Sequence, residues 1–364
     1  MVLVINLKCN SITFSASYHF YLSAFSENHN VKFLAILFFS LVFCQPSIAA
    51  SGKPLDDQSV VVTIKPLHSL VQAVLGDSAR ADLLLEGAAT PHGYQMKPSE
   101  QRAVLHADVV FFIDANMESF LAKSLNVLDP QTLQVPLADV AGIDLLKKRS
   151  GEEWEKHDHA HHEEPDEHDH DDHEHGHDDE ESAADKHAEH GFDSDLHIWL
   201  DPQNAIKMVE AIRASLSGRF PEQAGVFADN ASALVEQLRL LDAALGQQLS
   251  GLEQRPFVVF HDAYGYFEKR YGLQGVGSIL LDPQISPSIS QIRKIRERIS
   301  ESGAVCIFSE PQFSASLLDT VMEGLSVRRG VLDPLGSDIE PGAAHYFSTL
   351  RALAQGFADC LSGA

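Results

Sequence analysis

The stretch "SVVVTIKPLHSLVQAVLG" (Ser59–Gly76) decides the fold class of this chain. Its first eight residues form a β-branched run that predicts a buried strand ending at Pro66. From His68 onward, apolar residues recur at helical spacing, and Gly76 is a typical helix stop. A buried strand followed directly by a helix predicts a strand–helix–strand unit, in which the two strands pair in parallel.

The same alternation continues along the first third of the chain and returns in the last third. After the opening stretch we expect strands at 81–88 and 108–115, with a short helix between them that begins at Ser99 as its N-cap. The second set of expected strands lies at 256–260, 275–281, 304–310 and 327–336, and the expected helices lie at 263–272, 286–303 and 314–325. The predicted fold class is therefore α/β, with two lobes that each contain a mostly parallel sheet flanked by helices.

A long helical pattern lies between the two sets. Asp201 and Pro202 are typical of an N-cap and a first helical position, and apolar residues then keep helical spacing throughout 221–252. A helix of about 30 residues is about 45 Å long. We therefore predict an N-terminal lobe at 50–220 and a C-terminal lobe at 253–364, joined by one rigid helix at 221–252.

The N-terminal segment through Ala49 is expected to be a cleaved signal peptide. "FLAILFFSLVF" (Phe33–Phe43) is too short for a transmembrane helix, which needs about 20 residues, and small residues precede the expected cleavage site. A lipid anchor on Cys44 is the alternative, although the bulky residue before it is unfavourable. We also expect 1–30 to be a mis-called start, with translation beginning at Val31. Cleavage of this segment would leave an exported mature protein.

Most of the negative charge belongs to one segment. The formal net charge is −25, and −16 of it lies in 152–190, where 18 Asp and Glu residues accompany two Lys residues. Such a balance argues against nucleic acid as a partner, because binding it requires clustered Lys and Arg. Apolar residues are almost absent from this segment, so we expect a disordered loop within the first lobe. It holds eleven histidines that predict an auxiliary set of weak, exchanging metal sites: His157, His159, His161, His162, His168, His170, His173, His175, His177, His187 and His190.

Three histidines outside this loop are candidate ligands of a tighter site. They are His92 in "TPHGYQMKPS", His197 in "DLHIWLDP" and His261 in "FVVFHDAYGYF". His92 and His261 follow predicted strands, and open α/β sheets bind ligands outside the carboxyl ends of strands. Three neutral imidazoles and one further group make a tetrahedral Zn²⁺ site, whose affinity should fall below about pH 6.5 as the imidazoles become protonated. A lone His is more often structural, so the argument depends on the three together.

Several stretches resemble the periplasmic zinc-binding proteins of ABC uptake transporters, the ZnuA-like group of cluster A-I solute-binding proteins. They are "PHGYQMKPS", "DLHIWLDP", "VVFHDAYGYFEKRYG", "SEPQF" and "LDPLG", and the resemblance spans about Val60 to Cys360. It implies two α/β lobes with small relative motions, one rigid joining helix, and zinc in the cleft between the lobes. Carried over by position, His92, His197 and His261 match the three metal-binding histidines of the family, and 152–190 matches its His- and acid-rich loop.

The fourth ligand is less clearly indicated. Many of these zinc binders have a Glu just before the first His, whereas this chain has Pro91, which offers no side-chain oxygen. The resemblance points to Asp333, which aligns with a metal-binding Asp of manganese-type relatives, while water or His68 are alternatives. Those relatives usually carry a carboxylate where this chain has His261, and nitrogen-rich ligation favours Zn²⁺ over Mn²⁺.

The cysteines fit an exported protein. Cys9 and Cys44 fall in the segment expected to be removed, which leaves Cys306 and Cys360. A pair of cysteines in an exported chain predicts a disulfide, with two buried free thiols as the alternative. The resemblance implies the same pairing.

The function implied is a high-affinity Zn²⁺ receptor, monomeric and not an enzyme, that delivers zinc to an inner-membrane ABC permease. A secreted zinc hydrolase is one alternative, but no G-x-S-x-G occurs in the chain, and the pattern H-E-x-x-H occurs only at His173–His177, inside the segment expected to be disordered. A metal store or adhesin is another, which differs in whether zinc transport depends on the protein.

Overall fold

The computed structural model describes residues 2–9, 12–19, 59–149, 193–280, 283 and 287–363. The chain forms two compact units, Met1–Ser51 and Gly52–Ala364. In the first unit, β1 (Val2–Cys9) and β2 (Ile12–His19) pair as an antiparallel hairpin. The predicted signal-peptide core, its cleavage site and the His-rich loop lie outside the described residues. None of the helices in the described part of the chain is long and apolar enough to cross a membrane.

The second unit begins with a four-stranded parallel sheet in the order β4-β3-β5-β6. Its strands are β3 (Val60–Val62), β4 (Ala81–Leu83), β5 (Val109–Phe112) and β6 (Leu133–Pro136). The helices around it are α1 (Lys65–Leu75), α2 (Pro98–Leu105) and α3 (Ala122–Leu125). The three valines of β3 are fully buried, which explains why the central strand reads as a continuous apolar run rather than an alternating one.

A second parallel sheet follows in the order β10-β9-β7-β8. Its strands are β7 (Phe257–His261), β8 (Gly275–Leu280), β9 (Cys306–Ser309) and β10 (Arg328–Val331), accompanied by α7 (Gly265–Tyr271), α8 (Ile289–Ser302) and α9 (Ala315–Met322). In both sheets the second strand along the chain lies on one side of the first, and the third lies on the other. This reversal creates a crevice at the carboxyl ends of the first and third strands, where α/β proteins bind ligands.

Alternate residues of β7 pack into two different hydrophobic clusters. Phe257 and Val259 belong to the main hydrophobic cluster, which extends from the first lobe through the long helices. Val258 and Phe260 belong to a smaller cluster that includes Ile299 of α8. Because successive strand residues point to opposite faces, the second sheet is covered on both sides. The predicted two-lobed α/β architecture is therefore confirmed.

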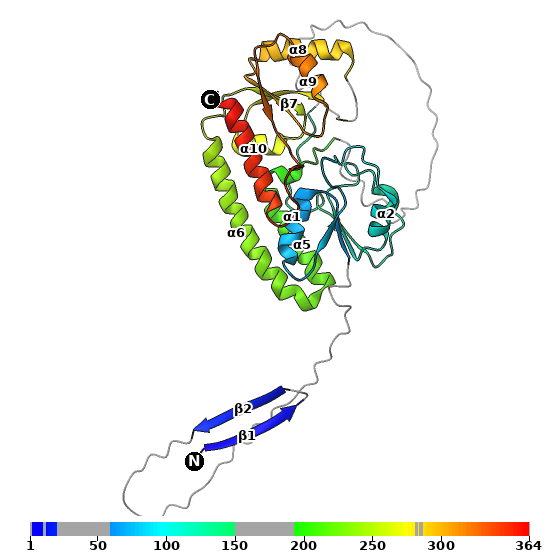
Figure 1. Ribbon diagram of the computed structural model, residues 1–364, viewed down its shortest axis with the longest axis vertical. Helices are drawn as coiled ribbons and strands as arrows, with labels where there is room; N and C mark the ends of the chain where they lie inside the picture. The colour runs from blue at the N-terminus through cyan, green and yellow to red at the C-terminus, as the bar shows by residue number, and fades with distance from the viewer. Residues whose placement is uncertain are drawn as a thin grey trace, which may run out of the picture. The chain divides into compact units, whose positions relative to one another are not determined.

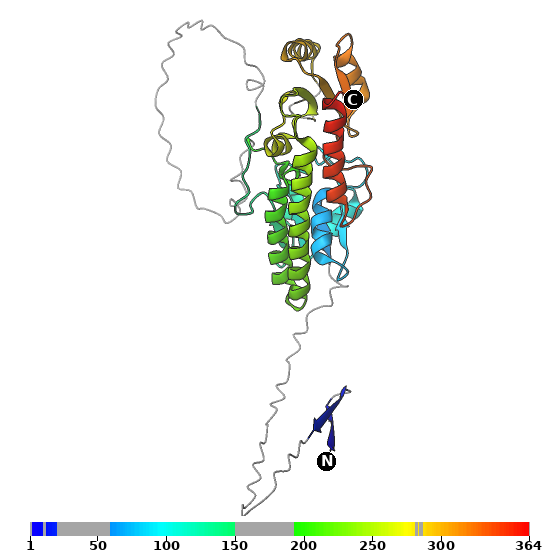
Figure 2. The same cartoon turned by 90° about the vertical axis from the view of Figure 1, so that its left-hand side faces the viewer.

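Four helices form a layer along one side of the second unit (Figure 2). They are α1, α5 (Pro202–Arg219), α6 (Ala224–Leu249) and α10 (His345–Leu361). The short 3-10 turns η3 (Ile198–Leu200) and η4 (Pro221–Gln223) precede α5 and α6. Helix α6 contacts α1 and α5 in the first lobe and α7 in the second, as expected of a connecting helix (Figure 1). Its 26 residues, about 39 Å, are fewer than predicted, because 221–223 form the separate turn η4 and the helix ends at Leu249, three residues early.

Local start and stop signals explain where sequence and structure agree or differ. Asp201 accepts a hydrogen bond from the Gln203 amide, as expected of the predicted N-cap. Gly303 ends α8 in the left-handed region, where the expected helix 286–303 also ends. The first strand ends at Val62 and not at Pro66, because Pro66 lies in the first turn of α1, where its missing N–H costs nothing. The expected cap of α2 was wrong for the same reason: a proline starts the helix, one residue before Ser99.

The last helix, α10, was not predicted from the sequence. It packs against α1 and α6 as well as β10, so the C-terminal end of the chain contacts elements of both lobes. The disulfide between Cys306 and Cys360 joins its last turn to the start of β9 and confirms the predicted pairing.

Candidate metal centre

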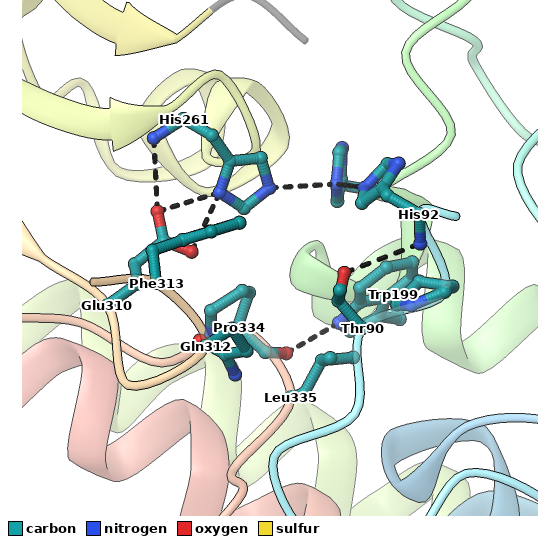
Figure 3. A pocket seen from close by; sticks show the side chains of 11 residues that line it. Thr90, His92, Trp199, His261, Glu310, Gln312, Phe313, Pro334 and Leu335 are labelled. Atoms are coloured by element: carbon teal, nitrogen blue, oxygen red, sulfur yellow. Dashed lines mark hydrogen bonds and ion pairs between the residues drawn. The ribbon is translucent and has the colours of Figure 1, made fainter. Parts of the chain in front are cut away.

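Three histidine side chains from distant parts of the second unit converge in one cavity (Figure 3). His261 is the last residue of β7, His197 directly precedes η3, and His92 lies in the loop between β4 and α2. One ligand atom from each lies within 4.8 Å of the others. The Nε2 of His197 is 3.3 Å from that of His92 and 3.4 Å from that of His261.

The switch point of the second sheet positions His261. Strands β7 and β9 are neighbours and run in parallel, so His261 at the end of β7 lies beside Glu310, which directly follows β9. Glu310 Oε1 accepts the backbone N–H of His261 at 3.1 Å and lies 2.7 Å from its Nδ1. Glu310 itself is 4% exposed. The imidazole is thereby fixed with its Nε2 directed into the cavity.

A turn within "DLHIW" positions His197 in the same way. Asp195 Oδ1 accepts the backbone N–H of His197 at 3.0 Å and lies 2.7 Å from its Nδ1. Neutral imidazole has one N–H, so a carboxylate at Nδ1 places the proton there and leaves Nε2 as a lone-pair donor. Both His197 and His261 are therefore held in the tautomer that binds a metal through Nε2.

His92 is held by a loop rather than by a strand end. Strand β4 ends at Leu83, earlier than predicted, so the expectation that His92 follows a strand directly was wrong. Its backbone N–H donates to Thr90 Oγ1 at 3.3 Å, and Gly93, at φ +71°, turns the chain immediately after it. This turn lets the loop present the imidazole to the other two histidines.

The distances between the Nε2 atoms are those of a tetrahedral zinc site. Zinc–nitrogen bonds of about 2.0–2.1 Å at tetrahedral angles place two ligand nitrogens about 3.3–3.4 Å apart. The two observed separations, 3.3 and 3.4 Å, match that value. Two imidazole lone pairs facing each other at this distance repel, and a cation between them converts that repulsion into attraction.

The cavity around the three histidines is small and has mostly apolar walls. Its volume is about 10 Å³, roughly the space of one water molecule or one ion. Besides the histidines, the lining residues are Thr90, Pro91, Trp199, Glu310, Gln312, Phe313, Pro334 and Leu335. Trp199 is fixed by the hydrogen bond from its Nε1 to the Pro334 carbonyl at 2.8 Å, so residues from both lobes close the cavity.

Burial and neighbouring charges shift the pKa values of the site residues in different directions. Desolvation, together with the two neighbouring imidazoles, lowers the pKa of His92 well below its usual value, and desolvation with His261 does the same for His197. For His261, burial lowers the pKa, but the Glu310 charge and hydrogen bond outweigh it, so the net direction is upward. Burial raises the pKa of Asp195 to about 7. Two of the three imidazoles are thus neutral, and ready to bind metal, near pH 7.

Neither predicted candidate for a fourth protein ligand joins the group. The Asp333 carboxylate accepts Gln312 Nε2 at 2.6 Å and the backbone N–H groups of Leu335 and Gly336 at 3.0 Å each, so it stabilises the turn of "LDPLG". His68 lies on α1, with Nε2 3.0 Å from the Ala81 carbonyl. Neither residue lines the cavity.

The sequence reading missed the two carboxylates that orient the histidines. Asp195 lies two residues before His197, a spacing that allows one turn to bind both the ring and the backbone N–H. Glu310 ends the predicted strand "AVCIFSE", and only the strand order shows that this strand neighbours the one carrying His261. The role of Asp195 could have been inferred from its spacing to His197, whereas the role of Glu310 required the sheet topology.

Two α/β lobes joined by a long helix, with a three-histidine centre between them, define a metal-binding member of the solute-binding proteins. The family model described as the periplasmic component A of the zinc-uptake complex, ZnuA, matches residues 60–360. The chain belongs to this family.

Similar proteins cover nearly the whole chain. The high-affinity zinc uptake system protein ZnuA of Brucella suis is 40% identical over 338 residues, which cover 92% of this chain and 99% of the relative. The corresponding protein of Paracoccus denitrificans is 37% identical, covering 83% and 91%. Among solved structures, the Zn(II)-bound ZnuA-like domain of Streptococcus pneumoniae AdcA is 26% identical with a TM-score of 0.58, covering 83% of this chain and 99% of that domain. A crystal structure of ZnuA, 24% identical, shares the fold with a TM-score of 0.64 and covers 84% and 99%.

Proposed function

We propose that the protein is a high-affinity Zn²⁺ receptor of a zinc-uptake system and binds the ion through Nε2 of His92, His197 and His261. The observation that carries this proposal is the approach of three Nε2 atoms while Asp195 and Glu310 occupy the Nδ1 atoms of two rings. That arrangement leaves lone pairs converging on one point. The names of the similar proteins, which are zinc-uptake proteins, support the same ion.

Water is proposed as the fourth ligand. Pro91 contributes no side-chain oxygen, and Asp333 is engaged by its own turn. Three nitrogens and one water in tetrahedral geometry favour Zn²⁺ over Mn²⁺, which prefers more numerous oxygen ligands. The selectivity of the site therefore follows from its donors and from its small volume.

The bound ion is proposed to be cargo and not a catalyst. Glu310 is the only carboxylate among the residues that line the cavity, and it is hydrogen-bonded to His261. A zinc hydrolase needs a general base beside the metal-bound water, and Glu310 is committed to orienting a ligand. We propose instead that a periplasmic, monomeric receptor hands zinc to an inner-membrane ABC permease. Zinc uptake by permease-bearing cells that lack the protein should then fail in zinc-limited medium.

The His-rich segment 152–190, which lies outside the described residues, is proposed to bind zinc weakly and to raise its concentration near the receptor. The sequence predicts disorder in this segment, and a disordered chain must be ordered at each binding event, so its affinity should be lower than that of a preformed site. Calorimetric titration of the mature chain and of a variant lacking 152–190 tests this hierarchy and the proposed function together. We expect the deletion to remove the weak equivalents and to retain one tight equivalent. Loss of the tight equivalent would contradict the proposal.

Zinc affinity is expected to decline as the pH falls from about 7. In the metal-free chain His261, with its raised pKa, and Asp195, with a pKa of about 7, hold protons that zinc must displace. The lowered pKa values of His92 and His197 keep those rings out of this competition. Affinity should therefore weaken by up to about a hundredfold per pH unit once both protons are bound. Calorimetry in buffers of different ionisation enthalpy measures the protons released, and zero release at pH 6.5 would contradict this assignment.

A further inference from the structure

Two segments of the first lobe pair with each other beside the metal centre. Residues 144–149 and 193–196 meet in an antiparallel bridge between Lys147 and Ser194. The backbone N–H of Asp195 donates to the Leu146 carbonyl at 2.8 Å. Because Asp195 orients His197, this pairing fixes the backbone that carries one of the proposed zinc ligands.

The paired segments are attached to helix α7 of the second lobe, which follows His261. The hydroxyl of Tyr266 donates to the Asp195 carbonyl at 2.7 Å and accepts the Leu146 N–H at 3.0 Å. One side chain of the second lobe therefore bonds to both members of the pair. The arrangement joins the two lobes within a few residues of the two ligands that have carboxylate partners.

Arg149 makes the strongest of these connections. Its guanidinium binds both oxygens of Asp262, with Nε 3.1 Å from Oδ2 and Nη2 in close contact with Oδ1. Nη1 also donates to Glu268 Oε2 at 2.6 Å. The side chains of Asp262 and Glu268 are 10% and 7% exposed, so the ion pairs are largely shielded from water. Asp262 is the residue directly after His261.

We infer that Arg149 is a positioning residue of the zinc site, a role that rests on the function proposed above. It fastens the end of β7, which carries His261, to the segment that carries Asp195 and His197. The ligand nitrogens of the two lobes are thereby held at zinc-binding separation before the ion arrives. Preorganisation of this kind raises affinity because ligands already in place lose little freedom on binding.

Positioning and charge predict opposite effects of removing Arg149. As a nearby positive charge, Arg149 repels Zn²⁺, so a neutral residue would tighten binding. As a clamp, it also neutralises Asp262 and Glu268. Its removal leaves two shielded carboxylates without their cation and loosens the end of β7 that carries His261. The bidentate geometry and low exposure favour the second effect. Outer partners of metal ligands typically change affinity by about 10- to 100-fold, and we expect a loss of that size.

Helix α7 provides two matched controls. Arg270 forms a similar bidentate ion pair with Asp242 of the connecting helix, with Nε 2.9 Å from Oδ1 and Nη2 close to Oδ2. Lys269 bonds to Asp144 of the paired segments at 2.7 Å, and both of these side chains are well exposed. Losing Arg270 tests whether any weakened attachment of α7 lowers affinity. Losing Lys269 tests whether the exposed ion pair between α7 and the paired segments affects zinc affinity.

The test compares Arg149→Met, Arg270→Met and Lys269→Met in the mature chain, by zinc competition titration and by the visible absorption of bound Co²⁺, whose intensity reports tetrahedral geometry. We expect Arg149→Met to lower zinc affinity about 10- to 100-fold and to weaken the Co²⁺ band, while the other two variants stay within about twofold of the parent. Arg149 is assigned wrongly if Arg149→Met binds as tightly as the parent or more tightly. An equal loss in Arg270→Met would also overturn the assignment.

Arg149→Lys keeps the positive charge but cannot reproduce the bidentate fork, so it separates the two roles even if Arg149→Met fails to fold. Positioning predicts that the lysine variant also loses zinc affinity, and full retention would overturn it. The zinc affinity of the parent chain separates failure of the proposed function from failure of the role assigned to Arg149. If the parent lacks a tight zinc site, the proposed function fails, whereas a tight parent site with an unaffected Arg149→Met refutes only the role of Arg149.

Discussion

The variant His197→Ala is expected to bind zinc about a thousandfold more weakly than the parent chain. Structural zinc sites contribute about 10–16 kcal/mol through four ligands, so one ligand accounts for roughly 3–4 kcal/mol, or two to three powers of ten. His197 lies at the upper end of this range, because its Nε2 is the atom that lies within 3.4 Å of both other Nε2 atoms. Its loss also leaves Asp195 buried without its imidazole partner.

Competition titration against a chelator of known affinity measures this loss. His92→Ala and His261→Ala should lower the affinity in the same direction, and the exposed His106 provides a matched control, since His106→Ala should leave it unchanged. The metal-free variants should remain folded, because the Nε2 edges of these rings face a cavity and not the hydrophobic core. Circular dichroism in chelator checks this condition. A folded His197→Ala that binds zinc as tightly as the parent would exclude His197 as a ligand.

The order of the elements could be read from the sequence, whereas their ends and neighbours could not. Buried valine runs such as Val60–Val62 have no other placement than a central strand, so the fold class followed directly. The boundaries near Pro66 and Ser99 were displaced, because proline is compatible with a first helical turn and the pattern alone gives no preference between the two starts. Helix α10 was missed although its buried residues, such as Leu350, Leu353 and Phe357, recur at helical spacing; only its contacts with both lobes could not be read from the sequence.

The candidate ligands were found from the sequence, but the details of the site were not. Histidines such as His261 at a strand end are recognisable because the crevice of an α/β sheet lies there. Glu310 was missed because it meets His261 only through the pairing of β7 with β9. Asp333 was chosen because the resemblance matches it to a metal-binding Asp of manganese-type relatives, and the structure shows its oxygens engaged by the turn that it caps. Long-range pairing and local hydrogen bonding are the two pieces of information that a single sequence lacks.

Loss of the disulfide between Cys306 and Cys360 is expected to lower the free energy of unfolding by up to about 4 kcal/mol. The two residues are 54 positions apart, and the chain-entropy relation for a loop of that length gives about 4 kcal/mol at 25 °C. The cross-link is also where α10 is held to the second sheet. Urea unfolding of the double variant Cys306→Ala and Cys360→Ala in the presence of chelator measures the change. Alanine is the appropriate replacement, because both cysteines are buried and serine would add an unpaired hydroxyl.

The same variant should bind zinc almost as tightly as the parent under conditions where it is folded. Cys306 begins β9 and Glu310 directly follows its end, so the disulfide and the carboxylate that orients His261 lie at opposite ends of one strand. A four-residue strand separates them by roughly 13 Å, and its pairing with β7 and β10 does not involve the cross-link. Stability and affinity should therefore respond independently. A loss of zinc affinity in the folded variant would show that α10 acts on the metal centre, and an unchanged unfolding curve would show that packing alone holds this helix.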